Sequence, residues 1–304
     1  MKQSILITGG SGLFAINCVR ALRNHFKIYL LQNKKIINVP GAKNIQFNSL
    51  NDDKLSRIFS EIKPLAVIHA AGLTDVNFCE LNPNAAYQAN SDFAGVMAKV
   101  CAKINCKIVY LSTDHIFDLS KDSATEKTQP NPINIYAKSK LEGERQIKKY
   151  CEKSLIIRTN FFGWGTSYRS SFSDFVFENL SKNKSIQLYE DIKYTPILLD
   201  QLVIGIIRLL NSNASGTYHI VGDEALSKFD FGNQLASIFG FDKSLINAVK
   251  YSEQNNNVPR PRNMCLNNNK YKKFSGDNVG SVADFLFGLR SQQVLGTHKE
   301  YNSI

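Results

Sequence analysis

The most informative part of this chain for its fold is Ser4-Ile5-Leu6-Ile7-Thr8-Gly9-Gly10-Ser11-Gly12-Leu13-Phe14-Ala15. Its apolar run is typical of a strand that is buried on both faces of a parallel sheet. A glycine-rich loop follows at once, and apolar residues at helical spacing continue from the loop to residue 22. A strand, a glycine loop and a helix in this order predict a dinucleotide-binding unit at the start of an α/β fold.

The glycine loop carries the specific chemistry of this unit. Gly10 and Gly12 permit a tight turn and a close approach of a pyrophosphate, and the helix start adds amide donors with a partial positive charge. Ala15 takes the place of the third glycine, which serves mainly helix–strand packing. We therefore predict that a dinucleotide contacts Gly9, Gly10, Ser11, Gly12, Leu13 and Phe14.

The end of the second expected strand, residues 27–31, bears on the choice of cofactor. An acidic residue there would bind the ribose hydroxyls of NAD, but the chain has Gln32, Asn33, Lys34 and Lys35. The lysines suit a 2′-phosphate, so NADP(H) is favoured, while NAD(H) stays open. The alternative is that both lysines are merely exposed to solvent.

Strand and helix patterns alternate regularly up to about residue 163. Further strands are expected at 45–47, 65–72, 107–111 and 154–158, and helices at 51–62, 84–104 and 135–150. This order predicts a doubly wound parallel Rossmann sheet, with residues 1–163 as the dinucleotide-binding domain. Residues 164–304 then form mainly a smaller substrate-binding lobe, with some segments returning to the first domain. In it we expect helices at 172–180, 199–210 and 229–239 and a strand at 216–221.

Tyr136 and Lys140 stand four residues apart on an expected helix and thus share a face. A phenol titrates near ~10, too high for efficient acid–base work at neutral pH, and a nearby ammonium group lowers that pKa. The pair alone decides nothing, because Tyr189 and Lys193 have the same spacing. The context decides, since Ser112-Thr113-Asp114 lies at the carboxyl end of a strand, where open α/β sheets bind their ligands.

Composition limits the other functions. The net charge of +11 is spread along all 304 residues, without an aromatic-interleaved basic patch, so we expect no nucleic-acid partner. No apolar run reaches about 18 residues and no signal peptide precedes the first strand, so we expect no membrane span and a cytoplasmic protein. The six cysteines form no CxxC pair and the five histidines show no metal-ligand spacing, so we expect reduced thiols and no metal.

These motifs together resemble those of the extended short-chain dehydrogenases/reductases, and among them the dTDP-4-dehydrorhamnose reductase branch. The resemblance covers nearly the whole chain. It rests on Thr8-Gly9-Gly10-Ser11-Gly12, Ala70-Ala71-Gly72, Asn90, Ser112-Thr113-Asp114, Glu126 with Pro130 and Pro132, Tyr136 with Lys140, Arg158-Thr159 and Arg260-Pro261-Arg262-Asn263.

The resemblance implies the NAD(P)H-dependent reduction of the keto group of a nucleotide-linked 4-keto-6-deoxy sugar, in deoxysugar or surface polysaccharide biosynthesis. Tyr136 would protonate the carbonyl oxygen, Thr113 would hydrogen-bond the same oxygen, and Lys140 would bind the nicotinamide ribose and lower the pKa of Tyr136. The implied cofactor contacts beyond the glycine loop are Asn33, Lys34, Ala70, Ala71, Gly72, Asn90, Ser112, Tyr136, Lys140, Asn160 and Phe161. The implied substrate contacts are Thr74, Asp114, His115, Phe161 and Arg260, with Arg262 as a second candidate for the pyrophosphate.

Two departures from the family leave the sugar open. The family often has Tyr where His115 stands and Trp where Phe161 stands. Related 4,6-dehydratases carry Glu at the position of His115, so dehydration is disfavoured. The alternatives are a nucleotide-sugar epimerase with tightly bound NAD and a non-catalytic NADP-binding subunit like the regulatory subunit of methionine adenosyltransferase. A homodimer is compatible with the resemblance, but no residue pattern decides the oligomeric state.

Overall fold

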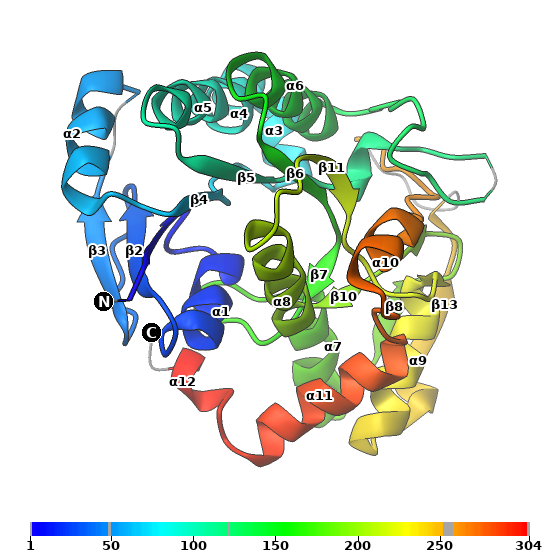
Figure 1. Cartoon of the computed structure of the whole chain (residues 1–304). Helices are drawn as coiled ribbons and strands as arrows, with labels where there is room; N and C mark the ends of the chain where they lie inside the picture. The colour runs from blue at the N-terminus through cyan, green and yellow to red at the C-terminus, as the bar shows by residue number, and fades with distance from the viewer. Residues whose placement is uncertain (1, 48–49, 121, 252–257, 303–304) are drawn as a thin grey trace.

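A seven-stranded parallel sheet forms the centre of the protein in the computed structural model, which describes residues 2–47, 50–120, 122–251 and 258–302 (Figure 1). The strand order is β3-β2-β1-β4-β5-β6-β11, and each neighbouring pair is parallel. The predicted doubly wound α/β fold is confirmed. In this order the strands are Ala42–Gln46, Lys27–Gln32, Ser4–Thr8, Ala66–His69, Lys107–Leu111, Leu155–Arg158 and Gly216–His219.

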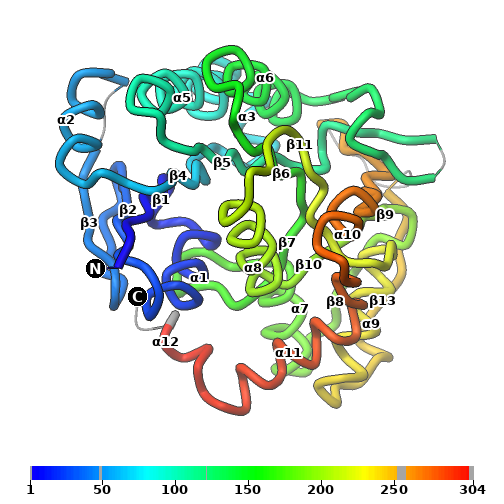
Figure 2. The backbone as a smooth tube through the Cα atoms, viewed as in Figure 1, coloured from blue at the N-terminus to red at the C-terminus, as the bar shows by residue number. Residues whose placement is uncertain are grey.

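Helices cover both faces of this sheet, as Figures 1 and 2 show. Successive side chains of a strand point to opposite faces, so Ile5 and Ile7 pack on one side and Leu6 on the other. The first side is covered by α1 (Leu13–Leu22) and α8 (Leu199–Leu210). The second is covered by α2 (Asp52–Ile62), α5 (Phe93–Lys103) and α6 (Ile135–Tyr150).

The main differences between the observed and the expected elements concern two strands and two helical segments. The third strand lies at Ala42–Gln46 rather than 45–47, and β4 ends at His69 rather than at 72. The helix expected at 84–104 is divided into α4 (Pro83–Tyr87), a π-helical segment (Gln88–Asp92) and α5. Helix α3 (Val76–Leu81) was not expected, because its six residues are too few for a helical pattern to stand out.

The second half of the chain adds three two-stranded sheets. They pair β7 with β10, β8 with β13 and β9 with β12. The strands are β7 (Phe161–Phe162), β8 (Ile186–Tyr189), β9 (Lys193–Tyr194), β10 (Ile197–Leu198), β12 (Leu226–Ser227) and β13 (Ile246–Val249). The helices are α7 (Phe172–Ser181), α9 (Lys228–Phe239), α10 (Asn269–Ser275), α11 (Val282–Val294) and α12 (Lys299–Asn302). Strand β11 and helix α8 come from this half but belong to the central layers (Figure 1).

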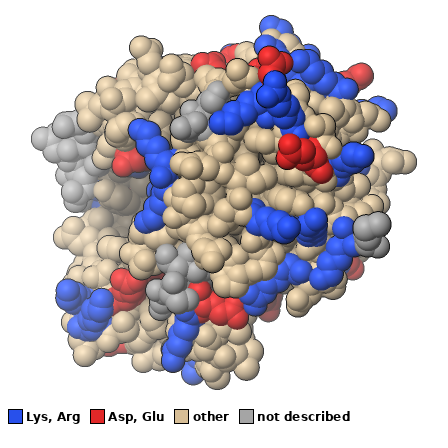
Figure 3. All heavy atoms as spheres, turned by 90° about the vertical axis from the view of Figure 1, so that its left-hand side faces the viewer, with Lys and Arg blue, Asp and Glu red and all other residues tan. Residues whose placement is uncertain are grey.

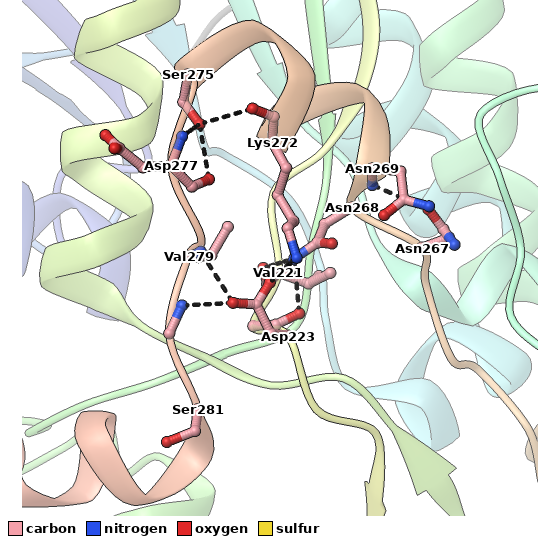
Figure 4. Close-up of polar contacts among 12 residues, drawn as sticks. Val221, Asp223, Asn267, Asn268, Asn269, Lys272, Ser275, Asp277, Val279 and Ser281 are labelled. Atoms are coloured by element: carbon pink, nitrogen blue, oxygen red, sulfur yellow. Dashed lines mark hydrogen bonds and ion pairs between the residues drawn. The ribbon is translucent and has the colours of Figure 1, made fainter.

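Asp223 joins three segments of the second half (Figure 4). Its carboxylate accepts hydrogen bonds from the Asn268 side chain at 2.8 Å and from the backbone amides of Val279 and Gly280 at 3.0 and 2.9 Å. The Lys272 ammonium group lies 3.3 Å from the same carboxylate. One side chain therefore ties the strand end after β11, the start of α10 and the loop before α11.

Lysines and arginines are scattered over the face drawn in Figure 3, with acidic groups among them. Among the described residues, no helix is long and apolar enough to cross a membrane. Within the same residues, no group of three or more His, Cys, Asp or Glu side chains is arranged to hold a metal ion.

Candidate active site

The glycine loop borders a cleft of about 670 Å³ at the carboxyl end of the sheet. Gly9 has φ +68°, and a Cβ on it would lie 2.9 Å from the Ala70 carbonyl oxygen, so only glycine fits there. Gly12 is the N-cap of α1 and offers no side chain to the first helical amides, which stay available to an anion. The loop thus has the geometry that a pyrophosphate needs.

Eight of the predicted cofactor residues line this cleft: Gly9, Ser11, Gly12, Asn33, Lys34, Ala70, Ala71 and Gly72. Three other predicted loop residues are not in its lining. Gly10 lies so close to β2 that a Cβ would be 2.7 Å from the Leu30 side chain. Leu13 packs against the core, and Phe14 is buried with its ring 6.1 Å from that of Phe161. These three residues pack against the protein interior and support the loop without lining the cleft.

A cationic end of the cleft combines residues from both halves of the chain. Lys34 and Lys35 follow β2, and Arg169 enters from the segment before α7. The Tyr168 hydroxyl donates to the Ser11 carbonyl oxygen at 2.9 Å, and the Lys35 ammonium nitrogen lies 3.1 Å from the centre of the Tyr168 ring. Tyr168 and Arg169 were not predicted from the sequence. They lie about 130 residues after Lys35, and no pattern in their own segment indicates that it reaches the cleft.

Asn90 is fully buried and lies outside this lining. Its side chain accepts from the Leu73 amide at 2.8 Å and donates to the Leu73 carbonyl at 3.0 Å and to the Ser139 hydroxyl at 2.9 Å. Gly72 passes so close to it that a Cβ would meet the Asn90 side-chain oxygen at 2.6 Å. Asn90 therefore holds the cleft wall next to Gly72 against α6.

Thr113 and Tyr136 are hydrogen-bonded beside β5, and Lys140 lies near the end of the same strand. Thr113 caps a short 3₁₀ turn, Asp114–Ile116, by accepting from the His115 amide at 3.2 Å. Tyr136 and Lys140 lie on α6 and are both buried, at 8% and 6% exposure. The Lys140 ammonium group donates to the Leu111 carbonyl at 2.6 Å and lies 4.1 Å from the centre of the Tyr110 ring.

The titration of this group differs from the expectation that Lys140 lowers the pKa of Tyr136. Burial raises the pKa of Tyr136, and although a side-chain hydrogen bond with Thr113 opposes this, Asp114 and Cys79 raise it further. Burial also lowers the pKa of Lys140 to about 7, against the charge of Glu144. Desolvation therefore outweighs charge pairing here, and Tyr136 stays a protonated phenol at neutral pH.

Glu144 lies one turn after Lys140 on α6. Its carboxylate accepts from the Ser112 hydroxyl at 2.6 Å and from Arg158 of β6 at 2.9 and 2.8 Å. The contact of Glu144 with Ser112 was missed, although Glu144 follows Lys140 by four residues and the spacing alone indicates a shared face. It fixes the strand end that presents Thr113.

Of the predicted substrate residues, Asp114 and His115 directly follow Thr113, and His115 contacts Tyr136. The Asn160 side chain donates to Asp114 at 2.7 Å, and burial raises the pKa of Asp114 to about 6. The His115 ring packs edge-on against Tyr136 with 5.5 Å between centroids, and burial lowers the pKa of this histidine to about 3. Phe161 is half-buried, whereas Thr74 is exposed after β4.

A second pocket of about 430 Å³ begins at His115. Arg260 lines it and also donates to the Asn77 side chain at 3.1 Å. Lys228 at the start of α9 lines it too, and no pattern in the sequence marked that lysine. Tyr189 and Lys193, the pair with the same spacing as Tyr136 and Lys140, end β8 and begin β9, so they share no helix face.

The arrangement has a definite chemical capacity. A protonated phenol and a hydroxyl group lie next to each other, and the phenol packs with Leu73 of the cleft lining and with His115 of the second pocket. Such a pair can donate to one oxygen atom and stabilise negative charge that develops on it.

Three comparisons with known proteins bear on this site. The family model described as "RmlD substrate binding domain" matches residues 1–282. The chain is 27% identical over 289 residues to the probable low-salt glycan biosynthesis reductase Agl14 of Haloferax volcanii, covering 94% of this chain and 96% of the relative. It is 26% identical over 303 residues to methionine adenosyltransferase 2 subunit beta of Bos taurus, covering 95% and 86%.

The fold also matches a solved structure, that of dTDP-4-dehydrorhamnose reductase from Bacillus anthracis in complex with NADP. The TM-score is 0.81 at 23% identity, with 96% of this chain and 100% of the other covered. At this identity the match demonstrates a shared fold.

Proposed function

The chain belongs to the RmlD substrate-binding domain family, and from this premise we propose that it reduces the keto group of a nucleotide-linked 4-keto-6-deoxy sugar with NADPH. It is an NAD(P)-dependent sugar-nucleotide oxidoreductase of the extended short-chain type. The observation that carries the proposal is the position of Tyr136 beside Thr113, on the helix that also carries Lys140. Tyr136 packs in one cluster with Leu73, which lines the dinucleotide cleft, and against His115, which lines the second pocket. In this proposal residues 164–304 supply mainly the substrate side.

A bound nicotinamide dinucleotide supplies the hydride in this reaction. Tyr136 donates its phenolic proton to the carbonyl oxygen of the substrate, and its raised pKa keeps that proton in place at neutral pH. Thr113 donates a hydrogen bond to the same oxygen and orients it. Lys140, held between the Leu111 carbonyl and the Tyr110 ring, binds the nicotinamide ribose in this proposal.

The cationic end of the cleft supports NADP(H) as the cofactor. Lys34, Lys35 and Arg169 line it, and the segment from Gln32 to Lys35 contains no carboxylate for the ribose hydroxyls of NAD. Guanidinium and ammonium groups are the usual partners of a 2′-phosphate.

Turnover is the direct test of the proposed function. The purified protein is incubated with NADPH and a panel of 4-keto-6-deoxy sugars linked to dTDP, UDP or GDP, and NADPH oxidation is followed by absorbance. We expect oxidation with at least one substrate, and no oxidation with the Tyr136→Phe variant. Absence of oxidation across the panel, with a control reductase active in the same assay, contradicts the proposal.

A non-catalytic binding role is a second candidate, favoured by the similarity to methionine adenosyltransferase 2 subunit beta. It predicts NADP binding without turnover and a stable protein partner in a pull-down. An epimerase predicts NAD that copurifies and no net consumption of added NADPH.

A further inference from the structure

The second pocket has walls that suit an anion carrying a flat apolar group. Phe172 and Phe175 of α7 and Tyr189 of β8 supply aromatic surface. Among the described residues, the Lys and Arg side chains in its lining are Lys228 and Arg260, and no Asp or Glu of that part of the chain lines it. A nucleoside diphosphate combines these two properties, because a base stacks on aromatic rings and phosphates bind cations.

The pocket adjoins Tyr136 through His115. His115 belongs to its lining, and the ring of His115 packs against that of Tyr136. A ligand that reaches Tyr136 with its ketone therefore extends the rest of its length past His115 into the pocket. That remote part is the nucleoside diphosphate of the proposed substrate.

Lys228 is held in this pocket with its ammonium group over two aromatic rings. It is the first residue of α9, and Ser227 and Asp230 close the helix start with a capping box. The ammonium nitrogen lies 3.3 Å from the centre of the Tyr194 ring and 4.4 Å from that of Phe172. Within the described residues it has no hydrogen-bond or ion-pair partner, and burial lowers its pKa to about 7.

Asp114 is the acidic group whose charge acts on Lys228. It acts on Lys228 through space and raises the pKa of this lysine, although no ion pair joins them among the described residues. The Asp114 carboxylate accepts hydrogen bonds from the Asn160 and Thr113 side chains. Lys228 therefore stands in an apolar setting with its charge only partly compensated, which favours an incoming anion.

We propose that Lys228 binds the diphosphate of the sugar nucleotide, opposite Arg260, and so determines the affinity for the nucleotide half of the substrate. Arg262, the other candidate for this role, is exposed and does not line the pocket. This inference rests on the proposed function, since it takes a sugar nucleotide as the ligand.

Binding without turnover tests the inference independently of the reaction. Affinities of dTDP and UDP for the NADPH-saturated protein are measured by calorimetry, for wild type and for Lys228→Met, which keeps the length and removes the charge. We expect the variant to bind the preferred nucleotide about 10- to 100-fold more weakly, as loss of a charge-assisted bond predicts. Lys228→Arg is expected to retain most of the affinity.

Lys270→Met is the matched control. Lys270 also lies over an aromatic ring, 4.0 Å from the centre of Tyr218, but it is not in the lining of either pocket. We expect unchanged nucleotide affinity in this variant. Equal affinity of wild type and a folded Lys228→Met protein overturns the inference, as does the absence of diphosphate binding by wild type.

Two further outcomes separate the inference from the proposed function. If no ketosugar is reduced but Lys228→Met weakens dTDP or UDP binding, the proposed reaction fails and the inference stands. If a ketosugar is reduced with an unchanged KM in Lys228→Met, the inference alone fails. If Lys228→Met does not fold, the test uses the wild-type protein and compares its affinity for the nucleoside with its affinity for the nucleoside diphosphate. We then expect the nucleoside to bind at least about tenfold more weakly, and equal affinities overturn the inference.

Discussion

Glu144 of α6 and Arg158 of β6 form a buried ion pair with 2.8 Å between Oε2 and Nη2, and their side chains are 1% and 4% exposed. The pair lies next to the end of β5, because Glu144 also accepts from the Ser112 hydroxyl. Arg158 stacks at 5.2 Å from the centre of the Phe117 ring. One ionic contact thus connects the helix that carries Tyr136 and Lys140 with the strand end that carries Thr113.

We expect Glu144→Gln to destabilise the protein by about 3–5 kcal/mol, since it leaves the buried charge of Arg158 without its counter-charge. Chemical denaturation followed by circular dichroism measures the change. Glu142→Gln on the same helix is the control, because its partner Arg145 is 66% exposed and such pairs contribute about 0–1 kcal/mol. Equal stabilities of the two variants would contradict the assigned role of the pair.

Tyr136→Phe is expected to lower kcat by about 10²- to 10⁴-fold, because it removes the transferable proton and little else. The NADPH dissociation constant, measured by fluorescence titration, stays close to that of wild type. Lys140→Ala is expected to impair both turnover and cofactor binding. Tyr150→Phe, at the far end of the same helix, serves as the control with normal turnover, and near-normal activity of Tyr136→Phe would refute the assignment.

Lys34→Ala and Arg169→Ala are each expected to weaken NADPH binding about tenfold, a typical loss for a contact with a charged group, while NADH affinity hardly changes. The reason is that only the 2′-phosphate distinguishes the two cofactors at this end of the cleft. Lys43→Ala, on the exposed edge strand β3, provides the control. The same loss for NADH and NADPH would show that these side chains do not recognise the 2′-phosphate.

Asp223→Asn tests a pH-dependent contribution to stability. Burial of Asp223 opposes its ionisation, but the Gly280 amide, Asn268 and Lys272 outweigh it and hold the pKa of the carboxyl below its ordinary value of 3.8. A carboxyl whose pKa is lower in the folded protein than in the unfolded chain stabilises the fold at pH values above the unfolded-state pKa. This stabilisation is lost as the pH falls through the folded-state pKa. We therefore expect the variant to be about 1–2 kcal/mol less stable at pH 7, with the difference shrinking below about pH 4.

Urea denaturation between pH 3 and pH 7 measures this effect. Asp277→Asn is the control, since its ion pair with Arg208 joins side chains that are 64% and 49% exposed. A stability difference between wild type and Asp223→Asn that is independent of pH would argue against an ionic role for this carboxylate.

Sequence patterns that extend over a few residues correctly predicted several strands and helices. The strand at Ser4–Thr8 and the helices at 135–150 and 199–210 have the expected bounds, because apolar periodicity and glycine punctuation act over a few residues. The same locality placed Tyr136 and Lys140 on one helix face. The small sheets of the second half were not predicted, since strands of two to four residues carry too little pattern.

Local patterns in the sequence account for the parallel sheet, the glycine loop and the residues at the strand ends, because hydrophobic period and glycine conformation are properties of neighbouring residues. Only the tertiary structure brought Arg169 to Lys34 and Lys228 to Asp114, residues that lie more than 100 positions apart. It also reversed the expected titration of Tyr136, because the desolvation that raises its pKa depends on everything packed around the phenol.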